Sequence, residues 1–257
     1  MIDVSLNALG ALAAEAGALA MTFWRGEFEQ WEKKPGDPVS EADLAVNRLL
    51  KERLTALDPE AGWFSEETAD SAERLLRPRV WVVDPIDGTR DFVRGRRGWC
   101  VSIAMVEGGR AILGVLDAPA RGEIWAAAAG RGATRNGETI RSADRLTLSG
   151  ARVPADILPR VDSDLTIVEK PNSIALRIAM VAAGEADLVA SIRWGHEWDI
   201  AAAALIAQES GATVTDARGA PFRYNSTEGG ALGVLAACPG IHAAAVERLR
   251  ERAAGAQ

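Results

Sequence analysis

The feature that most constrains the fold is a short apolar run, Val80–Val83, which leads directly into the string Asp84-Pro85-Ile86-Asp87-Gly88-Thr89. A continuous apolar run of this length, bounded by turn residues, predicts a buried strand. Asp84 then lies at the carboxyl end of that strand, and Pro85 fixes a turn and removes one backbone donor. The chain must therefore fold so that one carboxylate ends a buried strand and a second, that of Asp87, lies just beyond it.

The spacing within this string favours a cation site beside an anion site. Asp84 and Asp87 are three residues apart around the proline, so both carboxylates can face one point and the carbonyl of Ile86 can join them. Hard oxygen ligands that converge on a turn suit Mg²⁺. Gly88 and Thr89 follow where a helix could begin, and backbone N–H groups at such a point can bind a phosphate. An isolated Asp-Pro or Asp-Gly is usually only a turn, but the whole string predicts phosphoryl chemistry.

Three further acidic segments occur along the chain, and each has a plainer interpretation when taken alone. Glu66 and Glu67 follow an apolar stretch and could form a solvated loop. Asp199 falls where a helix is predicted to begin, and an acid there complements the helix dipole. Ser40 and Asp43 match a capping box, and we interpret Asp43 as that helix cap.

The composition limits the class of protein. The chain has 257 residues and a formal charge of −7, with 25% charged and 48% hydrophobic residues. These values are typical of a globular protein and exclude a disordered tail, a collagen-like chain and a disulfide scaffold. Because the balance is acidic and no long Lys/Arg run occurs, neither polymeric nucleic acid nor an anionic membrane surface is an expected partner.

Two features bear on the compartment. Cys100 and Cys238 are far apart and lie in apolar stretches, which predicts buried thiols and a reducing cytoplasm. The apolar stretch near the N-terminus is interrupted by Glu15 and preceded by Asp3 rather than by basic residues, so we expect no signal peptide. We also expect no membrane span, because no run of about 18 apolar residues is found.

The first part of the chain predicts two helices followed by strands. Apolar residues at helical spacing predict one helix over residues 2–20 and another from residue 40 to residue 57, where Asp58-Pro59 stops it. The breaker cluster 33–38 between them predicts a loop. After residue 80, short apolar runs separated by glycine-containing turns predict an antiparallel meander, with strands at 100–106, 111–116 and 123–128.

Beyond about residue 150, strands and helices alternate. The predicted strands are 165–168, 188–191, 213–215 and 232–236, and the predicted helices are 174–183, 200–209 and 241–252. We therefore expect a mixed α/β (α+β) protein with a single domain over residues 1–257. Two packed lobes are expected within it, about 1–148 with the antiparallel sheet and about 149–257 with the α/β pattern, with a seam near 145–155.

Taken together, the four acidic segments resemble those of the inositol monophosphatase superfamily of Mg²⁺-dependent phosphatases. The string Asp84–Thr89 is the family's most specific motif, Trp198-Asp199 is its second signature, and the resemblance spans roughly residues 34 to 216 in the right order. It implies the layered α/β/α/β/α sandwich of the inositol monophosphatase and fructose-1,6-bisphosphatase type, and a homodimer. It also implies a phosphomonoesterase that uses two to three Mg²⁺ ions per active site and is inhibited by Li⁺.

The resemblance implies a metal-binding role for five of the matching residues. Glu66, Asp84 and the carbonyl of Ile86 would hold a first Mg²⁺. Asp84, Asp87 and Asp199 would hold a second one. Glu66, with waters, would hold a weaker third, and so would also act in catalysis. Four carboxylates that converge without cations would repel one another and raise their pKa values, a penalty that the ions remove.

The resemblance also implies how the phosphate is bound. Gly88 and Thr89, with Asp87 beside them, would receive it, the first two through their backbone N–H groups. Thr89, hydrogen-bonded to Asp37, would help to activate the attacking water. Lys34 would position its loop or balance charge.

Three features bear on which phosphate ester is cleaved. Inositol monophosphatases usually carry an acid seven positions before the Asp of Trp-Asp, where it binds ring hydroxyls, and Ile192 stands there in this chain. The segments 64–67 and 87–92 resemble those of the 3'(2'),5'-bisphosphate nucleotidase branch. Arg193 could meet a second phosphate and Trp194 could stack on a base, although a surface ion pair and a rim aromatic explain the two equally well.

These features favour hydrolysis of 3'-phosphoadenosine 5'-phosphate to AMP and phosphate. The segment 34–39 also resembles that of histidinol-phosphate phosphatases, so histidinol phosphate and inositol 1-phosphate stay open as alternatives. A hypothesis of another class is a binding or regulatory homologue without turnover, which the intact acidic segments argue against.

Overall fold

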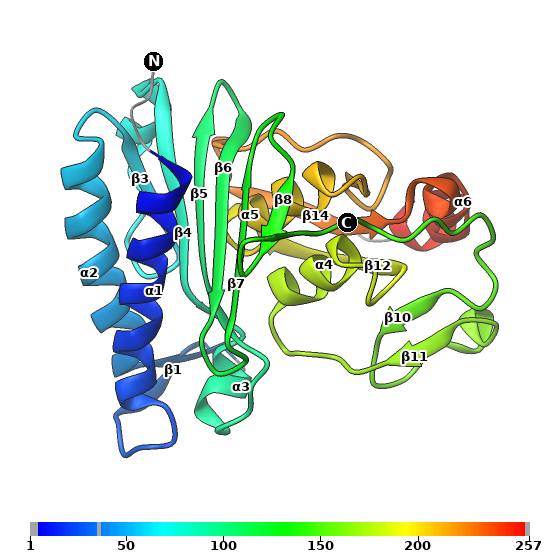
Figure 1. The fold of residues 1–257 in the computed structure, drawn as a ribbon, viewed down its shortest axis with the longest axis horizontal. Helices are drawn as coiled ribbons and strands as arrows, with labels where there is room; N and C mark the ends of the chain where they lie inside the picture. Colours follow the sequence, from blue (N-terminus) through cyan, green and yellow to red (C-terminus); the bar gives the residue numbers. More distant parts are fainter. Residues whose placement is uncertain (1–4, 35–36, 255–257) are drawn as a thin grey trace.

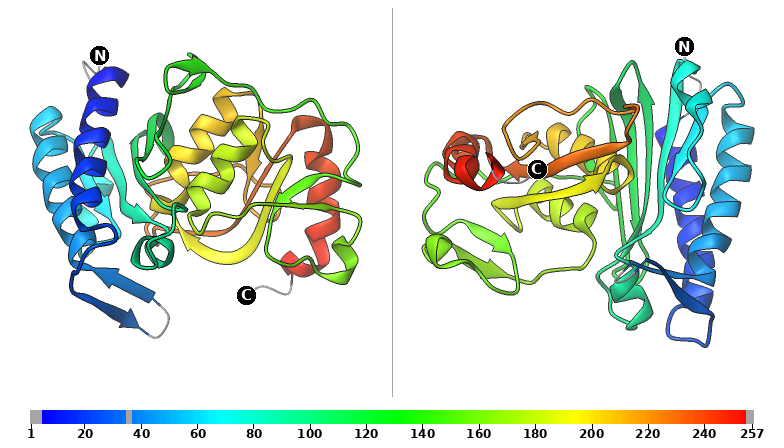
Figure 2. Two further views of the ribbon diagram at one scale, coloured as in Figure 1. Left: turned by 60° about the horizontal axis from the view of Figure 1, so that its bottom comes forward. Right: turned by 180° about the vertical axis from the view of Figure 1, so that it is seen from behind.

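The chain folds into five layers, helices alternating with sheets (Figure 1). The computed structural model describes the backbone of residues 5–34 and 37–254 and their side chains except those at 34, 37 and 251–254. A helix pair covers one face of a seven-stranded sheet, a second helix pair covers the other face, and a three-stranded sheet and a last helix follow (Figures 1 and 2). The predicted α/β/α/β/α sandwich is confirmed.

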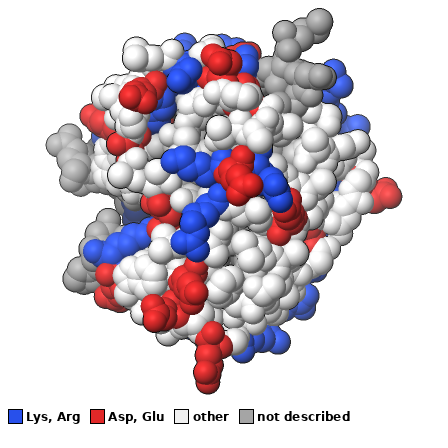
Figure 3. All heavy atoms as spheres, turned by 90° about the vertical axis from the view of Figure 1, so that its left-hand side faces the viewer, with Lys and Arg blue, Asp and Glu red and all other residues white. Residues whose placement is uncertain are grey.

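The outer helix pair consists of α1 (Leu6–Phe23) and α2 (Glu41–Leu57). The capping box predicted for the second helix is confirmed, because the backbone N–H of Ser40 donates to Asp43 Oδ2 over 2.8 Å. Basic and acidic side chains are interspersed on the outward face of this layer (Figure 3). Neither sign forms a continuous field on that face.

The segment between these helices differs from the loop predicted at 33–38. It forms an antiparallel hairpin of β1 (Gln30–Lys34) and β2 (Asp37–Ser40), with Trp31 opposite Val39. Residues 35 and 36, at its tip, lie outside the described residues.

The central sheet is built around the apolar run 80–83. Val80 and Val82 pack into the core under the inner helices, whereas Trp81 and Val83 pack under the outer pair. Side chains of a strand alternate between faces, so an entirely apolar run is what a strand covered on both faces requires.

The strand order of the central sheet is β3-β4-β5-β6-β7-β8-β9. Their bounds are Gly62–Ser65, Arg79–Asp87, Cys100–Glu107, Arg110–Ala118, Glu123–Ala128, Ala133–Arg135 and Glu138–Thr139. The predicted antiparallel meander corresponds to β5, β6 and β7.

The second half of the chain supplies the remaining layers. The helices α4 (Ile174–Ala182) and α5 (Glu197–Glu209) lie between the two sheets, and α6 (Pro239–Ala254) lies on the far side. The smaller sheet has the order β12-β14-β13 and is antiparallel throughout, with strands Leu188–His196, Gly230–Ala237 and Thr213–Thr215. A separate parallel pair joins β10 (Arg152–Pro154) to β11 (Thr166–Val168). The expected seam near 145–155 follows β9 and includes β10, and its interpretation as a boundary between lobes stays a prediction.

The first helix departs from one expectation. By length and composition alone α1 is apolar enough to cross a membrane, although a core helix passes the same test. Its buried residues, among them Leu9 and Ala13, pack with α2 and the sheet.

Candidate metal and phosphate site

The two aspartates of the central motif lie at the carboxyl end of β4, as the sequence predicts. The pairing of β4 with β5 places Asp84 opposite Ser102 and Asp87 opposite Cys100, so two residues of β4 bulge out opposite one residue of β5. Pro85, which has no N–H, occupies this bulge, where no ladder bond is needed. The backbone N–H of Ile86 donates to Asp84 Oδ1 over 2.9 Å, which closes the turn.

The residues after the bulge form a tight turn into the short helix α3 (Thr89–Val93). Gly88 has φ of +96°, and a Cβ there would lie 2.6 Å from the carbonyl oxygen of Gly98 and 2.9 Å from the backbone nitrogen of Ser173. Only glycine meets both conditions without strain. The hydroxyl of Thr89 lies 3.0 Å from the carbonyl oxygen of Ile86, to which it donates.

Glu66 is brought to the same edge of the sheet by β3, which runs parallel to β4. Ser65 pairs with Val83, and the backbone N–H of Glu66 donates to the Val83 carbonyl over 3.3 Å. The ammonium of Lys33, from the β1–β2 hairpin, lies 3.0 Å from Glu66 Oε1 and 2.5 Å from Glu67 Oε1. Glu66 and Glu67, which taken alone could form a solvated loop, therefore share the ammonium of Lys33.

Asp199 enters from the other half of the chain, in the first turn of α5. The backbone N–H of His196 donates to Asp199 Oδ2 over 3.0 Å, so this carboxylate also caps its helix. That helix begins at Glu197, three residues before the predicted start at 200, because this cap and the buried Glu197 lie within its first turn. Trp198 packs against Phe64, with ring centroids 4.8 Å apart, and so joins the α5 start to β3.

These groups line one open hollow of about 490 Å³. Of the predicted site residues, it is lined by Glu66, Asp84, Ile86, Asp87, Gly88, Thr89, Trp194 and Asp199. Arg193 lines an adjoining hollow instead. Lys34 and Asp37 contribute backbone to the hairpin, and their side chains lie outside the described part of the chain.

The electrostatics of the hollow favour a cation. Burial, together with the nearby charge of Glu66 and of the other carboxylates, raises the pKa of Asp84 well above its usual range. Burial also raises the pKa of Asp87, although the hydrogen bonds that this carboxylate accepts lower it in part. Among the side chains that the structure describes, no three acidic, histidine or cysteine groups are close enough together to hold a metal ion. The donor set of hard oxygens fits Mg²⁺, and a cation between the acids would offset the cost of burying them together.

Two residues that the sequence analysis placed elsewhere belong to this site. Asp43, interpreted only as a helix cap, also lies with its Oδ1 atom 3.4 Å from Thr89 Oγ1, whereas the sequence analysis assigned that contact to Asp37. Lys33 also reaches the acids, whereas the side chain of Lys34, the lysine that the resemblance implies, lies outside the described part of the chain. Helical spacing could not show that Asp43 contacts Thr89 at the start of α3, because that depends on how α2 packs on the sheet.

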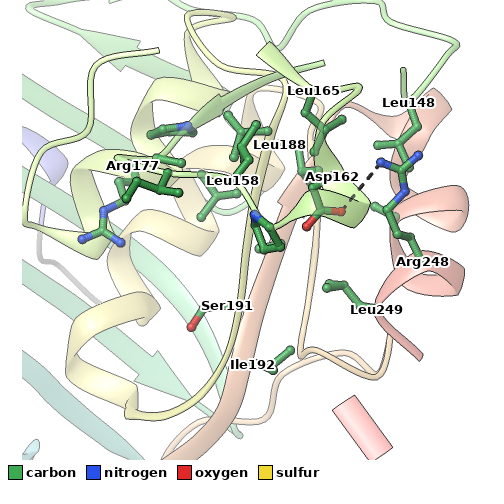
Figure 4. A pocket seen from close by; sticks show the side chains of 18 of the residues that line it. Leu148, Leu158, Asp162, Leu165, Arg177, Leu188, Ser191, Ile192, Arg248 and Leu249 are labelled. Carbon is green, nitrogen blue, oxygen red and sulfur yellow. Dashed lines mark ion pairs between the residues drawn. The ribbon is translucent and has the colours of Figure 1, made fainter. Parts of the chain in front are cut away.

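The position of Ile192 corrects one step of the substrate argument. The strand β12 bulges between Ser191 and Trp194, and Ile192, which lies in this bulge, is not among the residues that line the acidic hollow. Ile192 lines a separate, largely apolar cavity of about 200 Å³ between β12, α6 and the β10–β11 region (Figure 4). Its apolar side chain therefore carries no information about ring hydroxyls in the acidic hollow.

Known proteins resemble this chain over most of its length. A family model described as the inositol monophosphatase family matches residues 2–253. The chain is 35% identical over 219 residues to a fructose-1,6-bisphosphatase/inositol-1-monophosphatase of Thermotoga maritima, covering 81% of this chain and 83% of that protein. It is 30% identical over 236 residues to the 3'(2'),5'-bisphosphate nucleotidase CysQ of Escherichia coli K12, covering 87% and 95%.

A solved structure agrees over the whole chain. The inositol monophosphatase of Thermotoga maritima superimposes with a TM-score of 0.83 at 30% sequence identity, covering 96% of each chain.

Proposed function

Since this chain belongs to the inositol monophosphatase family, whose members are metal-dependent phosphomonoester hydrolases, we propose that its substrate is a 3'(2'),5'-bisphosphate nucleotide. The reaction would convert 3'-phosphoadenosine 5'-phosphate to AMP and phosphate. The 30% identity to CysQ over most of both chains supports this choice but does not separate it from the 35% identity to the Thermotoga enzyme.

The observation that carries the proposal is a second hollow, of about 180 Å³, that adjoins the acidic one. The two share Trp194, His196 and Asp199 in their walls. Arg177 and Arg193 line the second hollow, and guanidinium groups are well suited to bind phosphate. A substrate with two phosphates could place one among the acids and their cations and the other near the arginines.

Trp194 is placed to contact the rest of such a substrate. Its side chain is 60% exposed although it lies where the two hollows meet. An exposed indole offers a flat apolar face on which a base can stack.

The metal assignment follows the resemblance. Glu66, Asp84 and the Ile86 carbonyl would hold one Mg²⁺, Asp84, Asp87 and Asp199 would hold another, and Glu66 would contribute to a weaker third. When bound, these ions lower the pKa of a coordinated water and stabilise charge on the phosphoryl oxygens.

The chain's own groups then orient the reactants. The N–H groups of Gly88 and Thr89 hold the phosphate, and the hydroxyl of Thr89 orients the attacking water and takes its proton. The hydroxyl proton passes in turn to a carboxylate. For this step the hydroxyl turns from the Ile86 carbonyl, 3.0 Å away, to Asp43 Oδ1 at 3.4 Å, while Asp37 remains the acceptor that the resemblance implies. Lys34 stays a candidate for positioning the hairpin.

We further propose a cytoplasmic homodimer that is sensitive to Li⁺ and has no membrane or nucleic-acid partner. The interspersed charges of the α1–α2 face support the last point, since that face offers no basic field.

The decisive experiment is a phosphate-release panel at saturating Mg²⁺. It compares 3'-phosphoadenosine 5'-phosphate, inositol 1-phosphate, histidinol phosphate and fructose 1,6-bisphosphate by kcat/KM. We expect the nucleotide to rank first and Arg193→Ala to lower its kcat/KM while sparing monophosphates. A first rank for inositol 1-phosphate or histidinol phosphate would move the proposal to those alternatives. No release from any ester would favour a binding or regulatory homologue.

A further inference from the structure

Asp87 is held from the far half of the chain by two hydrogen bonds to one of its oxygen atoms. The Ser173 hydroxyl donates to Asp87 Oδ2 over 2.5 Å, and the Ala175 backbone N–H donates to the same atom over 2.7 Å. Ser173 and Ala175 lie at the amino end of α4, and both are fully buried. Among the described residues, no hydrogen bond reaches the other oxygen, Oδ1.

The orientation of the Ser173 hydroxyl is fixed by its other neighbours. Its oxygen accepts the Leu176 backbone N–H over 2.9 Å, which is the N-cap bond of α4. The thiol of Cys100 lies 3.4 Å away on a further side. A hydroxyl has one proton to donate, and with its acceptor sites facing other groups that proton points at Asp87.

The segment that leads into Ser173 is also anchored. Arg177 donates from Nε to the Pro171 carbonyl over 2.8 Å and from Nη2 to the Asn172 carbonyl over 2.5 Å. The backbone N–H of Asn172 donates to Asp91 Oδ2 over 3.0 Å. Ser173 is thus held on both sides, by its own helix and by the loop before it.

We propose that Ser173 is a positioning residue for the metal site. Its hydroxyl holds Asp87 so that Oδ2 faces α4 and Oδ1 is left to bind the cation. The proposal rests on the metal role of Asp87 given under the proposed function. Groups that hydrogen-bond a ligating carboxylate set its orientation, and their loss typically costs 10- to 100-fold in metal affinity or activity. The Ser173 hydroxyl and the Ala175 N–H together join the carboxyl end of β4 to the amino end of α4, and only the hydroxyl belongs to a side chain that a substitution can remove.

The test measures Mg²⁺ binding by isothermal titration calorimetry on the full-length chain, after the ions have been removed with EDTA. We expect Ser173→Ala to weaken Mg²⁺ binding by roughly 10- to 100-fold. Ser173→Thr keeps the hydroxyl, and we expect it to restore binding to within about threefold of wild type. Ser210→Ala is the matched control, since Ser210 is a buried serine that donates to a helix carbonyl away from the site.

Two readouts separate a positioning role from a structural one. The Tm in EDTA reports the fold without metal, and we expect Ser173→Ala to lie within a few degrees of Ser210→Ala there. In Mg²⁺ we expect Ser173→Ala to gain less Tm than wild type, because it binds the ion more weakly. If Ser173→Ala does not fold, the proposal is tested on Ser173→Thr and Ser173→Cys, and equal Mg²⁺ affinity in these two variants would overturn it.

The outcomes also distinguish this inference from the proposed function. Wild-type protein that binds no Mg²⁺ would contradict the metal assignment itself. Wild-type binding together with unchanged affinity in Ser173→Ala would overturn only the role of Ser173.

Discussion

The Oδ1 atom of Asp43 lies 3.4 Å from the hydroxyl oxygen of Thr89, while the Oδ2 atom of the same carboxylate caps helix α2 through Ser40. One buried side chain thus joins the outer helix layer to the motif at the end of β4. Burial raises the pKa of Asp43 to about 7, despite the bonds from Ser40 that lower it. A carboxyl group near neutrality can exchange a proton with its neighbour.

Asp43→Asn tests whether this contact serves turnover. The amide retains an oxygen for the cap but cannot take a proton from Thr89, so we expect kcat to fall by roughly 10²- to 10⁴-fold with a change in Tm of only a few degrees. Steady-state phosphate release and thermal unfolding measure the two effects. Unchanged kcat would return Asp43 to a purely capping role and favour Asp37 as the acceptor, which Asp37→Asn then tests directly.

Lys33→Gln tests the lysine that spans Glu66 and Glu67. Its ammonium competes for the same oxygen atoms as a cation, so we expect its removal to tighten the binding of the weakest Mg²⁺ several-fold in a calorimetric titration. Without metal the variant should have a lower Tm, because Glu66 and Glu67 lose the cation that they share. Lys34→Gln is the matched control, and a larger effect there would show that Lys34 is the lysine that matters.

Much of the fold could be predicted because its signals are local. The double-sided burial of β4 is encoded in a run of four apolar residues, and the capping box of α2 in two polar ones. The hairpin at 30–40 was missed because its strands carry charged residues and a proline, which are typical of a loop rather than of a strand.

The candidate site was only partly predictable, for a related reason. Glu66, Asp84, Asp87 and Asp199 belong to motifs in which neighbours in sequence indicate the chemistry. Ser173 has no such signal, since a serine before a helix predicts only an N-cap. Its contact with Asp87 joins residues 86 positions apart and depends on how α4 packs on the central sheet.

Gly88→Ala tests the turn that presents the phosphate-binding N–H groups. The backbone is left-handed there, and the added Cβ would meet the Gly98 carbonyl at 2.6 Å, so strain and collision combine. We expect a loss of roughly 2–4 kcal/mol in unfolding free energy and of most activity. Gly108→Ala is the matched control, because φ is also positive there but nothing lies within 4 Å of the new Cβ. Chemical denaturation should give about 1–2 kcal/mol for this control, and equal losses would show that crowding at Gly88 contributes nothing.

Asp117, on β6, is a buried acid outside the site, and it gives the stability of the chain a pH dependence. Burial raises the pKa of its carboxyl to about 7, and its Oδ2 atom has no hydrogen-bond partner within the described residues. It faces Gly17 of α1 so closely that a Cβ there would lie 1.7 Å from Oδ2. The carboxyl therefore sits against the backbone of the helix that the outer core depends on.

The sign of this effect follows from the two pKa values. Between about pH 4 and pH 7 the unfolded chain loses the Asp117 proton while the folded chain keeps it, so folding stability falls as the pH rises and stays lower above pH 7. We expect Asp117→Asn to be more stable than wild type at pH 8, by up to about 4 kcal/mol, and to lose that advantage toward pH 4. Urea unfolding of both proteins at pH 5 and pH 8 measures the difference between their unfolding free energies. The titration of the other acids is common to both proteins and cancels in this difference. Asp144→Asn, a substitution at an exposed position, provides the control for the lost charge. A stability difference that is the same at both pH values would show that Asp117 is already ionised in the folded chain.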